Sequence, residues 1–120
     1  MTSTHHTLDY IEIPVHDLAR ARDFYTAAFG WSFNDYGPTY AGIRSADGTT
    51  DVGGLALTEG RHTATGGVFV LLYSDDLDAS VTAVESAGGS VLQGPYEFPG
   101  GRRFHFADPS GNELGVWATQ

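Results

Sequence analysis

The sequence predicts an α+β fold built from two copies of a βαβββ module. The stretch Tyr10–Trp31 is an apolar strand segment that runs directly into an amphipathic helix segment. The same order of residue types returns 59 positions later, where Asp76-Leu77 matches Asp17-Leu18. Gly89 likewise matches Gly30. In a chain of 120 residues, a repeat of about half the length indicates two related supersecondary units in one domain, residues 1–120.

The first module is expected at about residues 8–57. Leu8–Val15 alternates as a strand, which places Tyr10 and Glu12 on one face and Ile11 and Ile13 on the other, beneath the helix. Asp17 is a helix N-cap, and Gly30 ends the helix in a left-handed conformation. Turn signals at residues 37–38 and 47–48 then separate three expected strands: Trp31–Tyr36, Tyr40–Ser45 and Val52–Leu57.

The second module is expected at about residues 68–118, after a linker at about 58–67 that has no periodicity. A turn is expected at Asp108–Asn112, before the last strand. The predicted elements are a strand at Val68–Tyr73, a helix at Leu77–Ala87, and strands at Ser90–Tyr96, Arg102–Phe106 and Leu114–Ala118.

Composition excludes several classes of function. The chain has no cysteine, so it has no disulfide framework, thiolate nucleophile or cysteine-based zinc site. All six basic residues are arginines, which excludes a Schiff-base lysine. A net charge of −9 repels phosphate backbones, so no nucleic-acid partner is expected. No signal-peptide pattern and no apolar run of about 20 residues is present, so we expect a cytoplasmic protein without membrane contact.

Two segments carry a resemblance to a known family: VHDLARARDFYTAAFGW at residues 15–31 and FADPSGNELGVW at 106–117. With the βαβββ order, they resemble the vicinal oxygen chelate superfamily, the glyoxalase, bleomycin-resistance and extradiol-dioxygenase group. The small single-domain branch related to lactoylglutathione lyase is the most similar. The resemblance covers Leu8 to Ala118. It implies an open, curved, eight-stranded mixed-sheet barrel around a central cleft, and a homodimer.

The resemblance also locates the metal-ligand positions of the family. They fall here on Tyr10, Phe69 and Gly115, and on the region of residues 52–55, which has only Asp51 at its edge. A neutral phenol is a poor ligand, and phenylalanine and glycine have no side-chain donor. We therefore expect no metal and no other cofactor.

Three interpretations of the polar residues expected in the cleft remain open. His105 with Glu12 or Glu113 could form an acid–base pair, in which a partly buried carboxyl group has a raised pKa. The same three residues could hold a relocated divalent metal. They could also have structural roles only. Arg103 could meet an anionic group, and Tyr10 and Phe69 are the best candidates for stacking on a ligand, with Trp31 and Tyr40 as further candidates.

These observations favour a protein that binds or sequesters a small organic molecule in an aromatic cleft without metal. The alternative is an enzyme of lyase, isomerase or dioxygenase type that acts through His105 and Glu12 or Glu113, with or without a relocated metal. A third hypothesis is that the protein has no ligand or catalytic site and only pairs with another protein.

Overall fold

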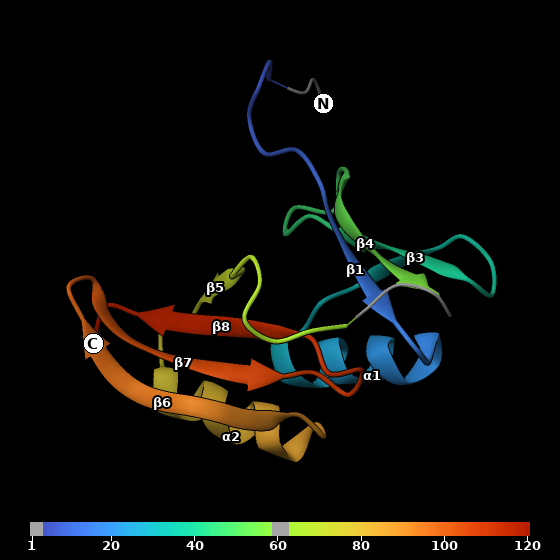
Figure 1. The fold of residues 1–120 in the computed structure, drawn as a ribbon. Coiled ribbons are helices and arrows are strands. Elements are labelled where there is room, and N and C mark those ends of the chain that lie inside the picture. Colours follow the sequence, from blue (N-terminus) through green and yellow to red (C-terminus); the bar gives the residue numbers. More distant parts are fainter. Residues whose placement is uncertain (1–3, 59–62) are drawn as a thin grey trace.

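The structure, a computed structural model, describes residues 4–58 and 63–120 and contains two consecutive βαβββ modules (Figure 1). The first module comprises β1 (Ile11–Val15), α1 (Leu18–Phe29), β2 (Phe33–Asp35), β3 (Tyr40–Arg44) and β4 (Asp51–Leu57). The second comprises β5 (Leu71–Tyr73), α2 (Leu77–Ser86), β6 (Ser90–Phe98), β7 (Gly101–Ala107) and β8 (Glu113–Ala118). Residues 59–62 of the expected linker lie outside the described residues.

Each module forms its own four-stranded mixed sheet. The N-terminal sheet has the order β1-β4-β3-β2, and the C-terminal sheet has the order β5-β8-β7-β6. In each, the first strand pairs in parallel with the last, and the other pairs are antiparallel. Both helices lie on the same side of the molecule, below the sheets in Figure 1. The predicted α+β fold is confirmed, and the two sheets stay separate, so the barrel is open.

The helix ends follow the local sequence. The carboxylates of Asp17 and Asp76 accept hydrogen bonds from the backbone N–H groups of Arg20 and Ala79, at 3.0 and 3.1 Å, which caps the two N-termini. Gly30 ends α1 with φ 72° and ψ 19°, the left-handed conformation that glycine adopts without a Cβ clash. The two helices are thus capped alike at their N-termini, whereas α2 ends at Ala87 in a right-handed conformation, so Gly89 does not take the role of Gly30.

One hydrophobic core connects the modules. Phe24 and Tyr25 of α1 are almost completely buried, and the Phe24 ring lies 6.0 Å from the ring of Phe106 in the second module. Helix α1 also packs against α2. Ile13 is in this core as expected, whereas Ile11 is 40% exposed and lines a cavity instead.

A buried polar network fixes the turn before β8. Asp108 is 4% exposed and accepts hydrogen bonds from the Tyr25 hydroxyl at 2.8 Å and from the backbone N–H groups of Ser110 and Asn112, each at 2.9 Å. The Asn112 side-chain amide donates to Asp108 at 3.0 Å and to the carbonyl oxygen of Pro14 at 2.8 Å. The Asp-Pro-Ser-Gly-Asn turn is thus a structural joint between the modules. In the described chain, no helix is both long enough and apolar enough to cross a membrane.

Candidate functional site

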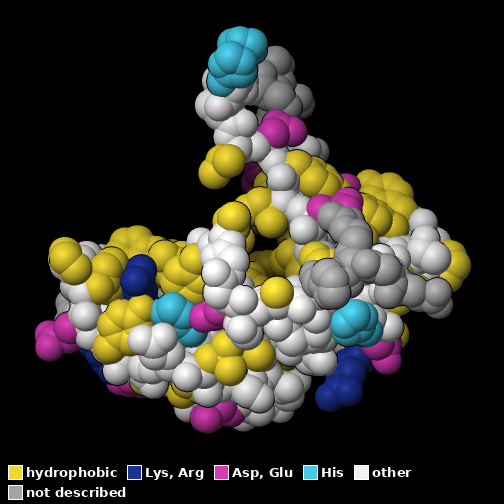
Figure 2. All heavy atoms as spheres, viewed as in Figure 1, with side chains coloured by type: hydrophobic (Ala, Val, Ile, Leu, Met, Phe, Trp, Pro, Cys, Tyr) yellow, Lys and Arg dark blue, Asp and Glu magenta, His cyan; other side chains and the backbone are white. Residues whose placement is uncertain are grey.

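The face of the C-terminal sheet that points away from α2 gathers aromatic and polar side chains. Strand alternation buries Phe104 and Phe106 on the helix side and places Arg103 and His105 on the opposite side. We call this second side the aromatic face; its residues are Phe69, Tyr96, Phe98, Arg103, His105, Glu113 and Trp117, with Tyr73 at its edge, where it contacts Trp117 and also lines the cavity described below. In Figure 2, hydrophobic side chains gather over β6, β7 and β8 with charged and histidine side chains among them.

Four polar side chains on the aromatic face form one hydrogen-bonded chain. Oε2 of Glu113 lies 2.7 Å from Nδ1 of His105, and Nε2 of His105 lies 2.6 Å from the Tyr96 hydroxyl. Nε of Arg103 donates to the same hydroxyl at 2.7 Å. The His105 and Glu113 side chains are only 14% and 16% exposed. The ring of Phe69 stacks on His105 at a centroid distance of 4.2 Å and so covers one side of these hydrogen-bonded side chains.

The hydrogen bonds of Glu113 favour its ionised form. The hydrogen bond with His105 lowers the pKa of Glu113, and the backbone N–H of Gly66, which donates at 2.7 Å, lowers it further. An ionised Glu113 accepts the hydrogen bond from Nδ1–H of His105, and the Tyr96 hydroxyl accepts from Nε–H of Arg103, since the Arg103 nitrogen can only donate. The raised carboxyl pKa expected for the acid–base pair is therefore wrong for Glu113, because its hydrogen bonds outweigh the effect of burial.

The corresponding face of the N-terminal sheet holds a separate group. The hydroxyls of Tyr10 and Tyr40 are hydrogen-bonded to each other, and Tyr40 donates to Glu12 at 3.1 Å. Removal from water raises the pKa of Tyr40, and its hydrogen bonds with Tyr10 and Glu12 raise it further. The Asp51 carboxylate accepts from Asn34 at 2.7 Å and from Tyr36 at 2.8 Å.

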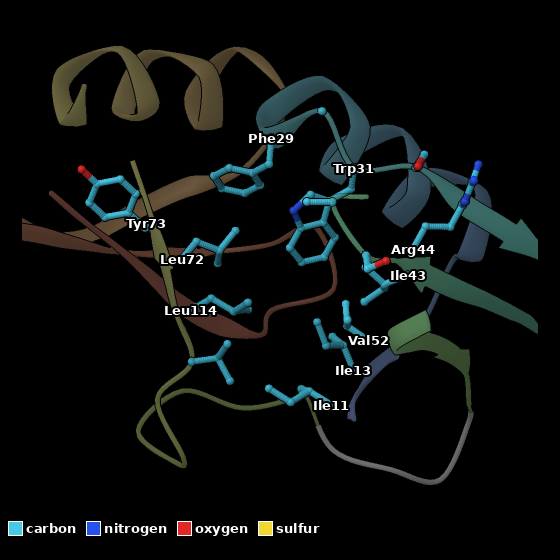
Figure 3. Close-up of a pocket in the computed structure, with 15 residues that line it drawn as sticks. Ile11, Ile13, Phe29, Trp31, Ile43, Arg44, Val52, Leu72, Tyr73 and Leu114 are labelled. Carbon is cyan, nitrogen blue, oxygen red and sulfur yellow. The ribbon is translucent and has the colours of Figure 1, made fainter. Parts of the chain in front are cut away.

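A cavity of about 670 Å³ lies on the helix side, between the two sheets. Figure 3 shows apolar side chains of both modules pointing into it, from Ile11 and Ile13 on β1 to Leu72 on β5 and Leu114 on β8. Trp31 forms part of the wall and stacks on Tyr25 at a centroid distance of 4.6 Å and an interplanar angle of 10°. None of the described residues that line the cavity is acidic.

Comparison with known protein families identifies the family of the chain. The family model of the Glyoxalase/Bleomycin resistance protein/Dioxygenase superfamily matches residues 7–116. The chain belongs to this superfamily.

Individual relatives add detail to this assignment. Anthracycline biosynthesis protein DnrV of Streptomyces peucetius is 33% identical in an alignment that covers 84% of the chain and 42% of DnrV. The chain thus spans less than half the length of that relative. A superfamily enzyme from Burkholderia phytofirmans superposes with a TM-score of 0.77 at 18% identity, covering 94% of the chain and 98% of the enzyme. TnmS3, an antibiotic binding protein from Streptomyces sp. CB03234, superposes with a TM-score of 0.67 at 24% identity, covering 98% of both chains. At these identities the two structures establish a shared fold.

The residues at the superfamily's metal-ligand positions do not fit a divalent metal. A Cβ added to Gly115 would collide with the ring of Phe69, so the ring occupies the space that any ligating side chain would need there. The hydroxyl end of Tyr40 lies in the same way over Gly54, and Asp51 is already hydrogen-bonded to two side chains. Within residues 4–58 and 63–120, no three His, Asp or Glu side chains lie close enough together to hold a metal ion.

The residues that the sequence predicts to form a site lie in three separate places in the structure. It brings His105, Glu113, Arg103 and Phe69 together on the aromatic face. It does not bring Glu12 to them, so the three-residue metal set of His105, Glu12 and Glu113 is not assembled among the described residues.

Tyr10 and Tyr40 lie with Glu12 on the N-terminal sheet, and Trp31 lies at the cavity. The sequence offered Tyr96 only as one of several aromatic residues for the cleft, and did not predict that its hydroxyl connects His105 to Arg103. The position of Tyr96 along β6 does not predict which face of the sheet its side chain is on, because register shifts between Val91 and Tyr96 break the strand alternation.

Proposed function

We propose that the protein binds a small organic molecule against the aromatic face of the C-terminal sheet. The observation that carries the proposal is the group of rings around a nearly buried polar chain. Flat rings such as Phe69 and Trp117 supply stacking surface, and the few polar groups between them supply orientation. Small-molecule sites typically combine these two features.

Two relatives support a ligand of the antibiotic kind. DnrV is described as an anthracycline biosynthesis protein, and TnmS3 as an antibiotic binding protein. We therefore propose an aromatic natural product as the ligand class. We also propose that a second copy of the chain contributes to the site, since the aromatic face is open and each sheet has unpaired edge strands. Sedimentation of the purified protein as a monomer at micromolar concentration would contradict this second proposal.

Native mass spectrometry tests the binding proposal. Untagged protein, prepared without chelator, is mixed with a panel of small aromatic natural products that includes an anthracycline. We expect at least one saturable adduct that Phe69→Ala weakens, because this substitution removes the ring that stacks on His105.

Val52→Trp is the matched control, since Val52 lies at the cavity on the helix side and not on the aromatic face. A panel without any saturable adduct would overturn the binding proposal. An adduct that is lost in Val52→Trp and kept in Phe69→Ala would place the ligand in the cavity instead.

A second candidate function is acid–base catalysis of a lyase or isomerase type. The hydrogen-bonded chain from Glu113 to Arg103 favours it. His105 Nε2 can take the Tyr96 proton, with Glu113 stabilising the imidazolium and Arg103 the phenolate, and Tyr96 could then take a proton from a bound molecule. Turnover of a substrate that is unchanged in His105→Ala would remove this candidate.

A further inference from the structure

Among residues 4–58 and 63–120, no carboxylate pairs with the positive charge of Arg103. Its Cζ lies 4.9 Å from the ring centroid of Phe98, 5.4 Å from that of Tyr96 and 5.5 Å from that of Phe69. Only Nε has a hydrogen-bond acceptor among the described residues, the Tyr96 hydroxyl. The guanidinium is therefore held in place by aromatic rings while its terminal N–H groups have no acceptor in the described part of the chain.

The lack of an acidic partner contrasts with the composition of the chain, which has 15 acidic residues and six arginines. The neighbouring Arg102 lies 3.3 Å from Asp78 in an ion pair. Glu97, opposite Arg102 on β6, alternates to the other side of the sheet. The Glu113 carboxylate is already hydrogen-bonded to His105 and to the backbone N–H of Gly66. The terminal nitrogens of Arg103 are not among the buried atoms that lack a partner, so they are accessible and can bind an anion that a ligand supplies.

We propose that the aromatic face selects a planar aromatic molecule that carries a carboxylate or a comparable oxyanion, and that Arg103 binds this anionic group. The inference rests on the proposed function and specifies its ligand. The guanidinium fork matches the geometry of a carboxylate, and hydrogen bonds between two charged groups are the strong ones. The rings around Arg103 supply the stacking surface and limit the access of water, which strengthens the contact.

Two probes that differ in charge test whether the aromatic face requires an anionic group on its ligand. Binding of 2-naphthoate and of 2-naphthalenemethanol, which has the same ring system without the charge, is measured by isothermal titration calorimetry. We expect the wild type to bind naphthoate at least about tenfold more tightly than the alcohol, as one charge-assisted contact implies. Arg103→Gln should abolish this preference, and Arg103→Lys should retain part of it. Arg102→Gln is the matched control and should leave the preference intact, since Arg102 contacts Asp78.

The outcomes separate this inference from the proposed function. Equal binding of the two probes to the wild type, or a preference that survives in Arg103→Gln, would overturn the inference. If Phe69→Ala still weakened the binding in that case, the proposed function would stand. If neither probe bound, or if Phe69→Ala bound both as the wild type does, the site itself would be refuted, and the inference with it.

Discussion

The hydrogen bond between Tyr25 and Asp108 joins α1 to the turn before β8, and its removal has a predictable cost. Both side chains are buried, and the hydroxyl lies 2.8 Å from the carboxylate. Tyr25→Phe keeps the ring in place and removes one hydrogen bond to a charged group, so we expect a loss of about 1.5–2 kcal/mol in the free energy of unfolding. Asp108→Ala removes the acceptor of four hydrogen bonds and should cost about 3–5 kcal/mol.

Urea denaturation followed by circular dichroism measures both losses. With an m-value of about 1–3 kcal/mol per molar urea, Tyr25→Phe should lower the midpoint by about 1 M. Tyr73→Phe is the control, because Tyr73 is 54% exposed and its hydroxyl has no hydrogen bond in the described part of the chain; it should change the stability by less than about 0.5 kcal/mol. A Tyr25→Phe variant that unfolds at the wild-type urea concentration would refute the role of this hydrogen bond.

The same network predicts a dependence on alkaline pH. Burial raises the pKa of Tyr25 above its ordinary value of 10.0, and the charge and hydrogen bond of Asp108 raise it further. A raised folded-state pKa gives stability that is complete below pH 10 and is lost as the pH rises through the folded-state value. The wild type should therefore lose stability more steeply above pH 10 than Tyr25→Phe does. Parallel curves for the two proteins would contradict this assignment.

Two further predictions concern the aromatic face. Gly115→Ala should push the Phe69 ring off His105, at a cost of about 1–3 kcal/mol, and shift the His105 ring protons in NMR spectra; unchanged shifts would contradict the observed close packing. Glu113→Gln should reduce the acid sensitivity of the fold, because the pKa of Glu113 is lowered and its stabilisation, complete above its ordinary value of 4.5, is lost as the pH falls through the folded-state value. Identical acid-unfolding curves for Glu113→Gln and the wild type would refute that contribution.

Local signals in the sequence were sufficient to predict the architecture. Asp17, Asp76 and Gly30 have the capping roles that their chemistry indicates, and the repeat correctly indicates two modules. Strand ends were less predictable, because they depend on pairing with another strand. Leu8 and Val68 extend the apolar pattern of their strands but are 96% and 94% exposed and lie outside β1 and β5.

The site was predictable only where strand alternation is regular. Alternation along β7 and β8 correctly places His105 and Glu113 on one face, within 2.7 Å of each other. It could not predict that Glu12 lies with Tyr40 on a separate sheet, since the relative placement of two sheets is a tertiary property. Trp31 is aromatic and near a strand, yet stacking on Tyr25 holds it on the helix side.

The two tryptophans of the chain report on the two places where a ligand could bind. Trp117 lies on the aromatic face, near Phe98 and Tyr73, and Trp31 lies at the cavity. A ¹⁵N-HSQC titration with 2-naphthoate, with the indole signals assigned through Trp117→Phe, follows both at once. Binding at the aromatic face predicts a saturable shift of the Trp117 indole signal while that of Trp31 stays in place. A shift of the Trp31 signal alone, or of neither signal, would contradict it.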